Sequence, residues 1–207
     1  MARLQPDWMD NYYSYGIDAR RRKIYFTEEV DEDSISRLIM SLDLLKSQNK
    51  EPIEIVMNSP GGEQYHMWAA FDAIRASHEH HITVRAIGHI MSAAPLIFAA
   101  GDERLAHQHV WFMFHEEQYY LEERHNNAKA TIAHYEKLEE QYARAMAARS
   151  TVASKNYKFW YNMANGSKSG LDLYHTAEEV MGMGLVDGII LDDGKIKRRD
   201  GKVEALN

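Results

Sequence analysis

Apolar residues follow two spacings along the first half of the chain, and each spacing predicts one kind of element. Short runs rich in β-branched and aromatic residues predict strands. The predicted strands cover residues 23–27, 53–57, 82–87, 104–106 and 109–114. Apolar residues three and four positions apart predict an amphipathic helix that begins at Asp33 or Ser34 and a second over 64–77. Gly88 is expected to end the third strand, and the small-residue run 92–100 predicts a short buried helix.

The order of these elements predicts an α/β fold. Strand and helix alternate three times, which favours parallel βαβ crossovers over a sandwich. Residues 121–148 then predict a long, highly charged helix with a thin apolar stripe, typical of a helix that packs against another subunit. Thr176 and Glu179 have the spacing of a capping box for a short helix that ends at Gly184, before a last strand at 185–191.

This organisation indicates a single domain over residues 23–191. We expect an N-terminal arm at 1–22, since its polar and aromatic residues follow no clear period. We expect a polar C-terminal tail at 192–207.

Composition narrows the function classes. The 207 residues carry 24 Lys and Arg against 31 Asp and Glu, a formal net charge of -7, which argues against nucleic acid as a partner. The absence of cysteine excludes disulfides and thiolate chemistry. The N-terminus lacks the apolar stretch of a signal peptide, and no apolar run is long enough to span a membrane. We therefore expect a cytoplasmic protein without a membrane partner.

Three side chains are candidates for chemistry, and each also has an ordinary structural interpretation. Ser92 follows a predicted strand and opens the small-residue helix, where free amides favour a developing oxyanion; it could equally be a plain N-cap. His115 ends an apolar strand, where parallel α/β folds place their sites, or is one surface histidine among eleven. Asp172 precedes the capped helix, or is an ordinary loop aspartate. The G-x-S-x-G elbow is absent, so the α/β-hydrolases are not supported.

A histidine-rich stretch invites a metal interpretation that we set aside. His78, Glu79, His80 and His81 are consecutive at a predicted helix-to-strand junction, so their side chains diverge instead of converging on one ion. We expect neither a metal nor a cofactor.

Four motifs in sequence order resemble the ClpP family of serine peptidases. NSPGG at 58–62 is similar to the turn after an early strand of that family. Residues 88–101 resemble its nucleophile helix, with a serine followed by small residues that end in Ala-Ala-Gly. WFMFH at 111–115 resembles the strand that ends in its base, and 172–187 resembles its segment from the catalytic aspartate to the final helix and strand. The resemblance covers roughly residues 23–187.

The resemblance implies roles for single residues. Ser92 would be the nucleophile, His115 the general base and Asp172 the acid that orients the histidine. The backbone amides of Gly62 and Ala93 would form the oxyanion hole. The residues expected to contact substrate are Gly61, Glu116 and Glu117.

The resemblance also implies an architecture and an assembly. The fold would be the ClpP/crotonase-like spiral of stacked βαβ units, with a protruding handle helix at about 121–150. Subunits would form a homo-oligomer of heptameric rings paired into a tetradecamer, and a serine endopeptidase would cleave peptides or unfolded polypeptide inside its chamber. The segment before residue 23 does not match the loops through which the family contacts an AAA+ unfoldase, so that partner stays open.

Departures from the family pattern mark this chain as a divergent member and leave alternatives. Glu116 and Glu117 stand where the family usually has Pro and Gly that pair with substrate, and Ala93-Ala94 replaces Met-Gly. The alternative functions are a catalytically silent or regulatory ring subunit, a crotonase-type acyl-CoA enzyme, and a phage maturation peptidase on the same fold.

Overall fold

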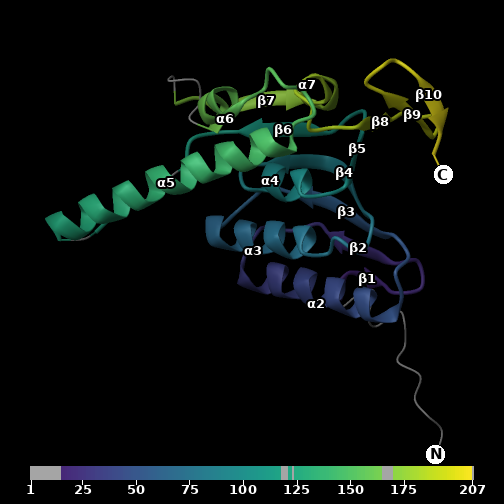
Figure 1. Cartoon of the computed structure of the whole chain (residues 1–207), viewed down its shortest axis with the longest axis horizontal. Helices are drawn as coiled ribbons and strands as arrows, with labels where there is room; N and C mark the ends of the chain where they lie inside the picture. The colour runs from purple at the N-terminus through teal and green to yellow at the C-terminus, as the bar shows by residue number, and fades with distance from the viewer. Residues whose placement is uncertain (1–14, 118–120, 123, 165–169, 207) are drawn as a thin grey trace, which may run out of the picture.

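The chain folds into a mixed α/β structure in which ten strands form one sheet (Figure 1). The computed structural model describes residues 15–117, 121–122, 124–164 and 170–206. The strands are β1 (Ile17–Asp18), β2 (Lys23–Phe26), β3 (Ile53–Ser59), β4 (Ile82–Met91), β5 (Glu103–His107), β6 (Trp111–Phe114), β7 (Leu173–Thr176), β8 (Gly188–Ile190), β9 (Lys195–Arg198) and β10 (Val203–Ala205). The helices are α2 (Glu32–Gln48), α3 (Gln64–Arg75), α4 (Ala94–Ala99), α5 (His125–Arg149), α6 (Tyr157–Ala164) and α7 (Ala177–Gly182).

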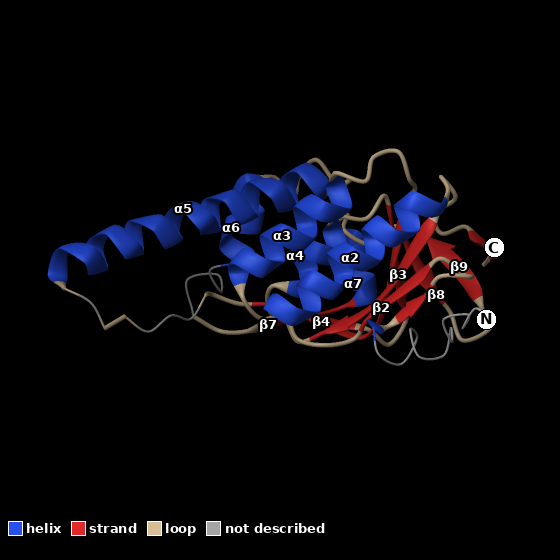
Figure 2. Ribbon diagram, turned by 90° about the horizontal axis from the view of Figure 1, so that it is seen from below, coloured by secondary structure: helices blue, strands red, loops and turns tan. Residues whose placement is uncertain are grey.

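The predicted parallel crossovers form the centre of the molecule. Strands β2, β3, β4 and β5 are neighbours and run parallel, and α2, α3 and α4 connect them in turn. These helices lie side by side on one face of the sheet (Figure 2). Each buries its apolar stripe there, as Leu38, Leu42 and Leu45 do on α2.

The first helix begins earlier than predicted. Asp31 caps α2 instead of Asp33 or Ser34, because its carboxylate accepts a hydrogen bond from the Ser34 amide at 2.8 Å. The Ser34 hydroxyl accepts in return from the Asp31 amide at 3.0 Å, which completes a capping box. The sequence pattern alone favours Asp33 or Ser34 because aspartate and serine are both common at N-cap positions.

The expectation that Gly88 ends a strand is wrong, since β4 runs through it to Met91. Gly88 has φ +64°, and a Cβ there would lie 2.5 Å from the Asn58 Oδ1 atom. That oxygen accepts a hydrogen bond from the His89 amide at 3.0 Å, while the register of β3 and β4 shifts between Met57 and Ser59. The bulge bends β4 instead of ending it.

The bend divides β4 between two partner strands. Before Gly88 the strand pairs with β5, and after it residues 89–91 pair with β6. The sheet therefore forks, and β6 and its antiparallel partner β7 form a short branch beside the main path. This branch carries two of the three candidate catalytic residues.

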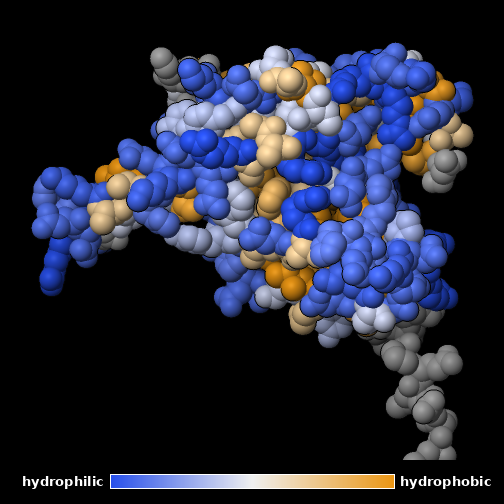
Figure 3. Space-filling model, in the orientation of Figure 1, coloured by the Kyte–Doolittle hydropathy of each residue, from blue (hydrophilic) through white to orange (hydrophobic). Residues whose placement is uncertain are grey.

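Helix α5 is long and leaves the body of the molecule (Figure 1). It begins at His125, not at residue 121, and its buried residues all lie in its second half. Arg149 anchors its C-terminal end by donating to the carbonyls of Ala99 at 2.8 Å and Gly101 at 2.6 Å. On the face drawn in Figure 3 the surface is mostly hydrophilic, with separate hydrophobic areas that include part of this helix.

The two ends of the chain add strands that the sequence analysis did not expect. β1 pairs with β2 in the segment taken as an arm, and β9 and β10 continue the sheet beyond β8 in the segment taken as a tail. Residues 1–14 of the expected arm lie outside the described residues. The predicted capping box of Thr176 and Glu179 is confirmed at α7, whereas α6 and β7 were not predicted. None of the described helices is long and apolar enough to cross a membrane.

Candidate active site

Ser92 lies in the turn between β4 and α4 in a backbone conformation that is rare for serine. Its φ is +59°, in the left-handed region, which costs a residue with a side chain about 1–3 kcal/mol. The Ser92 amide donates to the Met113 carbonyl on β6 at 2.9 Å, which ties the turn to the neighbouring strand. Ala93, not Ser92, is the N-cap of α4, so the plain N-cap interpretation is wrong. The hydroxyl is therefore free to contact another side chain.

The turn that follows β3 supports Ser92 from the other side. Gly61 has φ +94°, and a Cβ on it would lie 2.5 Å from the Ser92 Cβ and 2.8 Å from the Ala93 amide nitrogen. Only a residue without a side chain fits this contact. Gly61 thus packs against the backbone of the serine turn and does not line the adjacent cavity, which differs from its expected contact with substrate.

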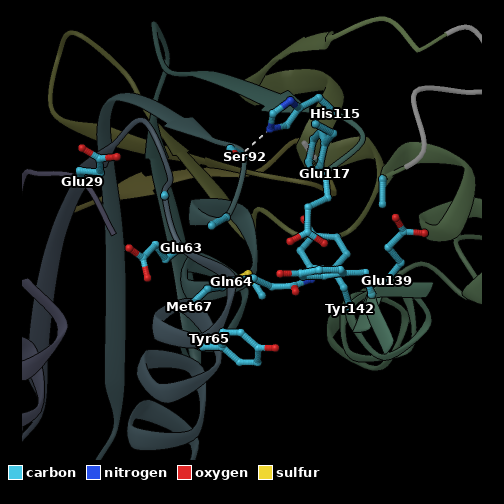
Figure 4. A pocket seen from close by; sticks show the side chains of 15 residues that line it. Glu29, Glu63, Gln64, Tyr65, Met67, Ser92, His115, Glu117, Glu139 and Tyr142 are labelled. Carbon is cyan, nitrogen blue, oxygen red and sulfur yellow. Dashed lines mark hydrogen bonds between the residues drawn. The ribbon is translucent and has the colours of Figure 1, made fainter. Parts of the chain in front are cut away.

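His115 reaches Ser92 because their strands are in register. In the parallel pairing of β4 with β6, Met91 lies opposite Met113. Ser92 is the first residue after β4 and His115 the first after β6, so both lie at the same edge of the sheet. The His115 Nε2 atom lies 2.7 Å from the Ser92 Oγ atom (Figure 4). The hydroxyl donates in this hydrogen bond when the ring carries its proton on Nδ1. This is the geometry of a nucleophile and its general base.

Asp172 lies on the other side of the imidazole, at a longer distance. β7 pairs with β6 antiparallel, with Leu173 opposite Phe114, which puts Asp172 opposite His115. The Asp172 Oδ1 atom is 3.7 Å from the His115 Nδ1 atom, an ion-pair contact too long for a hydrogen bond. The Asp172 side chain is 47% exposed against 22% for His115. Catalytic hydrogen bonds are often long in sites without a ligand, and they shorten when substrate binds.

The backbone amides of Gly62 and Ala93, the expected oxyanion donors, have no hydrogen-bond partner among the described residues. Val30 bridges Gly62 in parallel: its amide donates to the Gly61 carbonyl and its carbonyl accepts from the Glu63 amide, both at 2.8 Å. This pairing leaves the amide of Gly62 itself pointing to the other side. Both Gly62 and Ala93 line the cavity beside Ser92.

The cavity beside Ser92 has a volume of about 490 Å³. It extends from the Ser92–His115 pair to the second half of α5, which contributes Glu139 and Tyr142 (Figure 4). Glu117 points into it from beyond the end of β6, two residues after His115. Its neighbour Glu116 is exposed and does not line the cavity. Of the two glutamates expected to contact substrate, only Glu117 is therefore placed to do so.

The carboxylates of the cavity have unusual electrostatics. Burial, followed by the charge of Glu139, raises the pKa of Glu117 to about 7, although the nearby Gln64 side chain lowers it in part. Burial also raises the pKa of Glu139, with added repulsion from Glu116 and Glu136. Perturbed carboxyl groups in a cleft are typical of functional sites.

Sequence reasoning missed the contributions of α3 and α5 to this cavity. Gln64 begins α3 two residues after Gly62, and the sequence pattern marks it only as the start of a helix. Tyr135, Glu139 and Tyr142 lie at positions i, i+4 and i+7 of α5, a spacing that places them on one helix face. That periodicity was the available signal. Among the described residues, no group of three or more potential ligand side chains is placed to hold a metal ion.

Comparisons with known proteins identify the family to which the chain is similar. The family model described as Clp protease matches residues 8–193. The chain is also similar to the ATP-dependent Clp protease proteolytic subunit 2 of Pseudomonas aeruginosa, with 28% identity over 187 residues that cover 84% of each chain.

Proposed function

The chain belongs to the Clp protease family, and on that premise we propose that it is a serine endopeptidase acting on peptides or unfolded polypeptide. The observation that carries the proposal is the 2.7 Å contact between Ser92 Oγ and His115 Nε2 at the mouth of a cavity. A histidine within hydrogen-bond reach of a serine in a strained turn is the arrangement that makes a hydroxyl nucleophilic.

In the first half of the proposed reaction, Ser92 becomes acylated. Its Oγ attacks the scissile carbonyl carbon while His115 Nε2 takes the hydroxyl proton. The carbonyl oxygen gains negative charge and accepts hydrogen bonds from the Gly62 and Ala93 amides. The tetrahedral intermediate then expels the amine, which takes the proton from His115, and an acyl-enzyme ester remains.

In the second half, water replaces the amine. The water oxygen attacks the ester carbonyl while His115 takes a proton from the water. His115 then returns this proton to Ser92 Oγ as the carboxylic acid product leaves. Asp172 holds the imidazole in the tautomer with the proton on Nδ1 and stabilises the imidazolium that forms twice per cycle. A contraction of its present 3.7 Å contact would complete the relay.

We extend the proposal to the assembly. The chain would act in the cytoplasm as a homo-oligomer of heptameric rings paired into a tetradecamer, with an AAA+ unfoldase as an optional partner. The long helix supports a role as the handle between rings, because residues 125–137 contain no buried side chain in the described chain. Analytical ultracentrifugation tests the assembly, and a purely monomeric protein would contradict it.

The proposed chemistry is tested by hydrolysis of a fluorogenic peptide and of an unfolded protein. Wild type should cleave both, with an initial burst if deacylation limits the rate, and Ser92→Ala should cleave neither. If the intact, folded wild type has no activity above Ser92→Ala, the proposal fails in favour of a silent ring subunit. The crotonase-type alternative loses support, since the matching family model is that of Clp proteases.

A further inference from the structure

The cavity beside Ser92 is acidic and lacks cationic side chains. Four glutamates line it, and among its fifteen lining residues, all in the described part of the chain, none is Lys or Arg. Glu29 and Glu63 lie on one side of the opening, and Glu117 and Glu139 lie on the other (Figure 4). Glu63 has a contact with His66 at 3.3 Å, whereas Glu29, Glu117 and Glu139 form no ion pair among the described residues. Three of the four carboxylates therefore have no cationic partner in the described chain.

Glu117 holds an acceptor atom that is buried without a partner. Its Oε2 atom is shielded from solvent and makes no hydrogen bond within the described chain. The Oε1 atom of Gln64 is in the same condition in the same cavity. A buried acceptor that lacks a donor typically costs about 1–3 kcal/mol. When Glu117 is ionised, both atoms are acceptors and neither can satisfy the other, so the ionised cavity has room for a donor from a ligand.

A cationic donor suits the cavity best, because four glutamates and, of the described residues, neither Lys nor Arg line it. Burial and the charge of Glu139 oppose ionisation of Glu117, and a positive charge between the two carboxylates would offset that opposition. Repulsion between like charges would become attraction to a shared partner. A neutral side chain would satisfy the acceptors without relieving this repulsion.

The remaining walls of the cavity suit an aliphatic stem. Met67 is 2% exposed and Tyr142 is 9% exposed, and both line the cavity with Phe114 and Ala164. Lys and Arg pack their methylene stems on apolar surface while the charged end reaches polar groups. A volume of about 490 Å³ accommodates such a side chain.

We propose that this cavity binds the Lys or Arg side chain of the substrate residue whose carbonyl Ser92 attacks, with Glu117 and Glu139 as its specificity-determining carboxylates. This inference rests on the proposed function. The position follows from the lining of the cavity, since Gly62, Ser92 and Ala93 line the same space as Glu117. The residue that carries the scissile carbonyl has the shortest path into it.

Binding to the intact Ser92→Ala protein tests the proposal without requiring catalysis. Fluorescence anisotropy compares two labelled peptides of identical sequence that end in Lys or in Leu, as cleavage products would. The Lys peptide should bind about tenfold tighter or more, the size expected of a charge-assisted hydrogen bond in a shielded site. Adding Glu117→Gln or Glu139→Gln should remove most of this preference.

Glu140→Gln is the matched control, because it removes the same charge one residue away. Its side chain is 52% exposed, lies outside the cavity and pairs with Arg144 at 3.7 Å. It should leave the Lys preference unchanged. Equal binding of the two peptides, or equal loss in all three variants, would overturn the proposal.

The outcome is separable from that of the proposed function. Peptide hydrolysis by wild type together with equal binding of the Lys and Leu peptides would remove the specificity and keep the peptidase. A Lys preference that depends on Glu117 in a protein without hydrolysis would keep the binding site and remove the peptidase.

Discussion

The fold holds the two partners of the His115 ring, Ser92 and Asp172, with different firmness. Ser92 lies 2.7 Å from Nε2, and Asp172 lies 3.7 Å from Nδ1. The serine turn is fixed from several directions, by the amide bond to the Met113 carbonyl and by close packing against Gly61. Asp172 precedes β7 with a half-exposed side chain, and its other described contact is the Tyr174 hydroxyl at 3.5 Å.

The difference shows which part of a triad a sheet can position by itself. Paired strands in register bring the nucleophile and the base to one edge before any substrate is present, and the strain at Ser92 persists because its surroundings over-determine it. The position of Asp172 depends on the backbone that leads into β7, a short strand in the branch of the sheet. We expect substrate or a neighbouring subunit to complete that contact.

The largest effect should come from the firmly held side. Ser92→Ala or His115→Ala should lower kcat by about 10⁶-fold, since removal of either member disables the pair as a unit. Steady-state peptide hydrolysis measures the loss, and His109→Ala is the control because its side chain is 82% exposed and outside the cavity. Losses below tenfold would show that the 2.7 Å contact is not used in turnover.

Asp172→Asn tests the loosely held side. If the contact contracts in the transition state, the variant should lose about 10⁴-fold in kcat through the wrong histidine tautomer, with assembly unchanged. Tyr174→Phe, which removes only the 3.5 Å contact to Asp172, should have a small effect by comparison. Full activity of Asp172→Asn would reduce the site to Ser92 and His115 alone.

The pH dependence should distinguish the acidic cavity from the catalytic pair. Glu117 has a pKa of about 7, so it is neutral below that pH and ionised above it. The preference for a Lys peptide over a Leu peptide should therefore rise severalfold between about pH 6 and pH 8. In Glu117→Gln the ratio should rise much less over this range, because only Glu139 remains, and a pH profile equal to that of wild type would contradict the assignment. The other titratable side chains that line the cavity are Glu29, Glu63, Tyr65, His115, Tyr135, Glu139 and Tyr142.

The same pKa predicts a stability effect. Folded Glu117 keeps its proton to higher pH than the unfolded chain, whose ordinary value is 4.5, so the unfolded form ionises first and stability falls as pH rises from there to about 7. Glu117→Gln lacks this loss. The Tm of Glu117→Gln minus the Tm of wild type should therefore increase as the pH is raised from acidic to alkaline, which differential scanning fluorimetry can measure. If the Tm of both proteins changes with pH in the same way, the raised pKa is contradicted.

The smallest effect concerns the strain that holds Ser92. Ser92→Gly should relieve the positive φ, whereas Ser92→Ala keeps a side chain in the same conformation. With both inactive, the glycine variant should have a Tm higher by roughly 2 °C, about the shift expected for a gain of less than 1 kcal/mol. A Tm for Ser92→Gly lower by several degrees, more than the entropic cost of glycine accounts for, would show that the turn is not strained.

The sequence predicted the elements that depend on local patterns. The parallel strands and their crossover helices follow from hydrophobic spacing, and the α7 capping box follows from Thr176 and Glu179. The motifs also brought Ser92, His115 and Asp172 together as candidates, although no single one was persuasive alone. Their order in the chain, not their separate chemistry, carried that prediction.

Features that depend on contacts between distant segments escaped the sequence analysis. The continuation of β4 through Gly88 requires the Asn58 side chain, thirty positions earlier, to fill the bulge. Helical periodicity places Glu139 on one face of α5 with Tyr135 and Tyr142, but it does not show that this face lines the cavity beside Ser92. The short strands β7, β9 and β10 are defined by partners and not by apolar runs.

The most direct test of the central claim is covalent labelling of the intact protein with a fluorophosphonate, followed by mass spectrometry of the labelled peptide. The geometry at Ser92 and His115 predicts one phosphonyl group per chain on Ser92, no labelling of Ser92→Ala, and greatly slowed labelling of His115→Ala. A wild-type protein that stays unlabelled, or that carries the label on another residue, would contradict the assignment of Ser92 as an activated nucleophile.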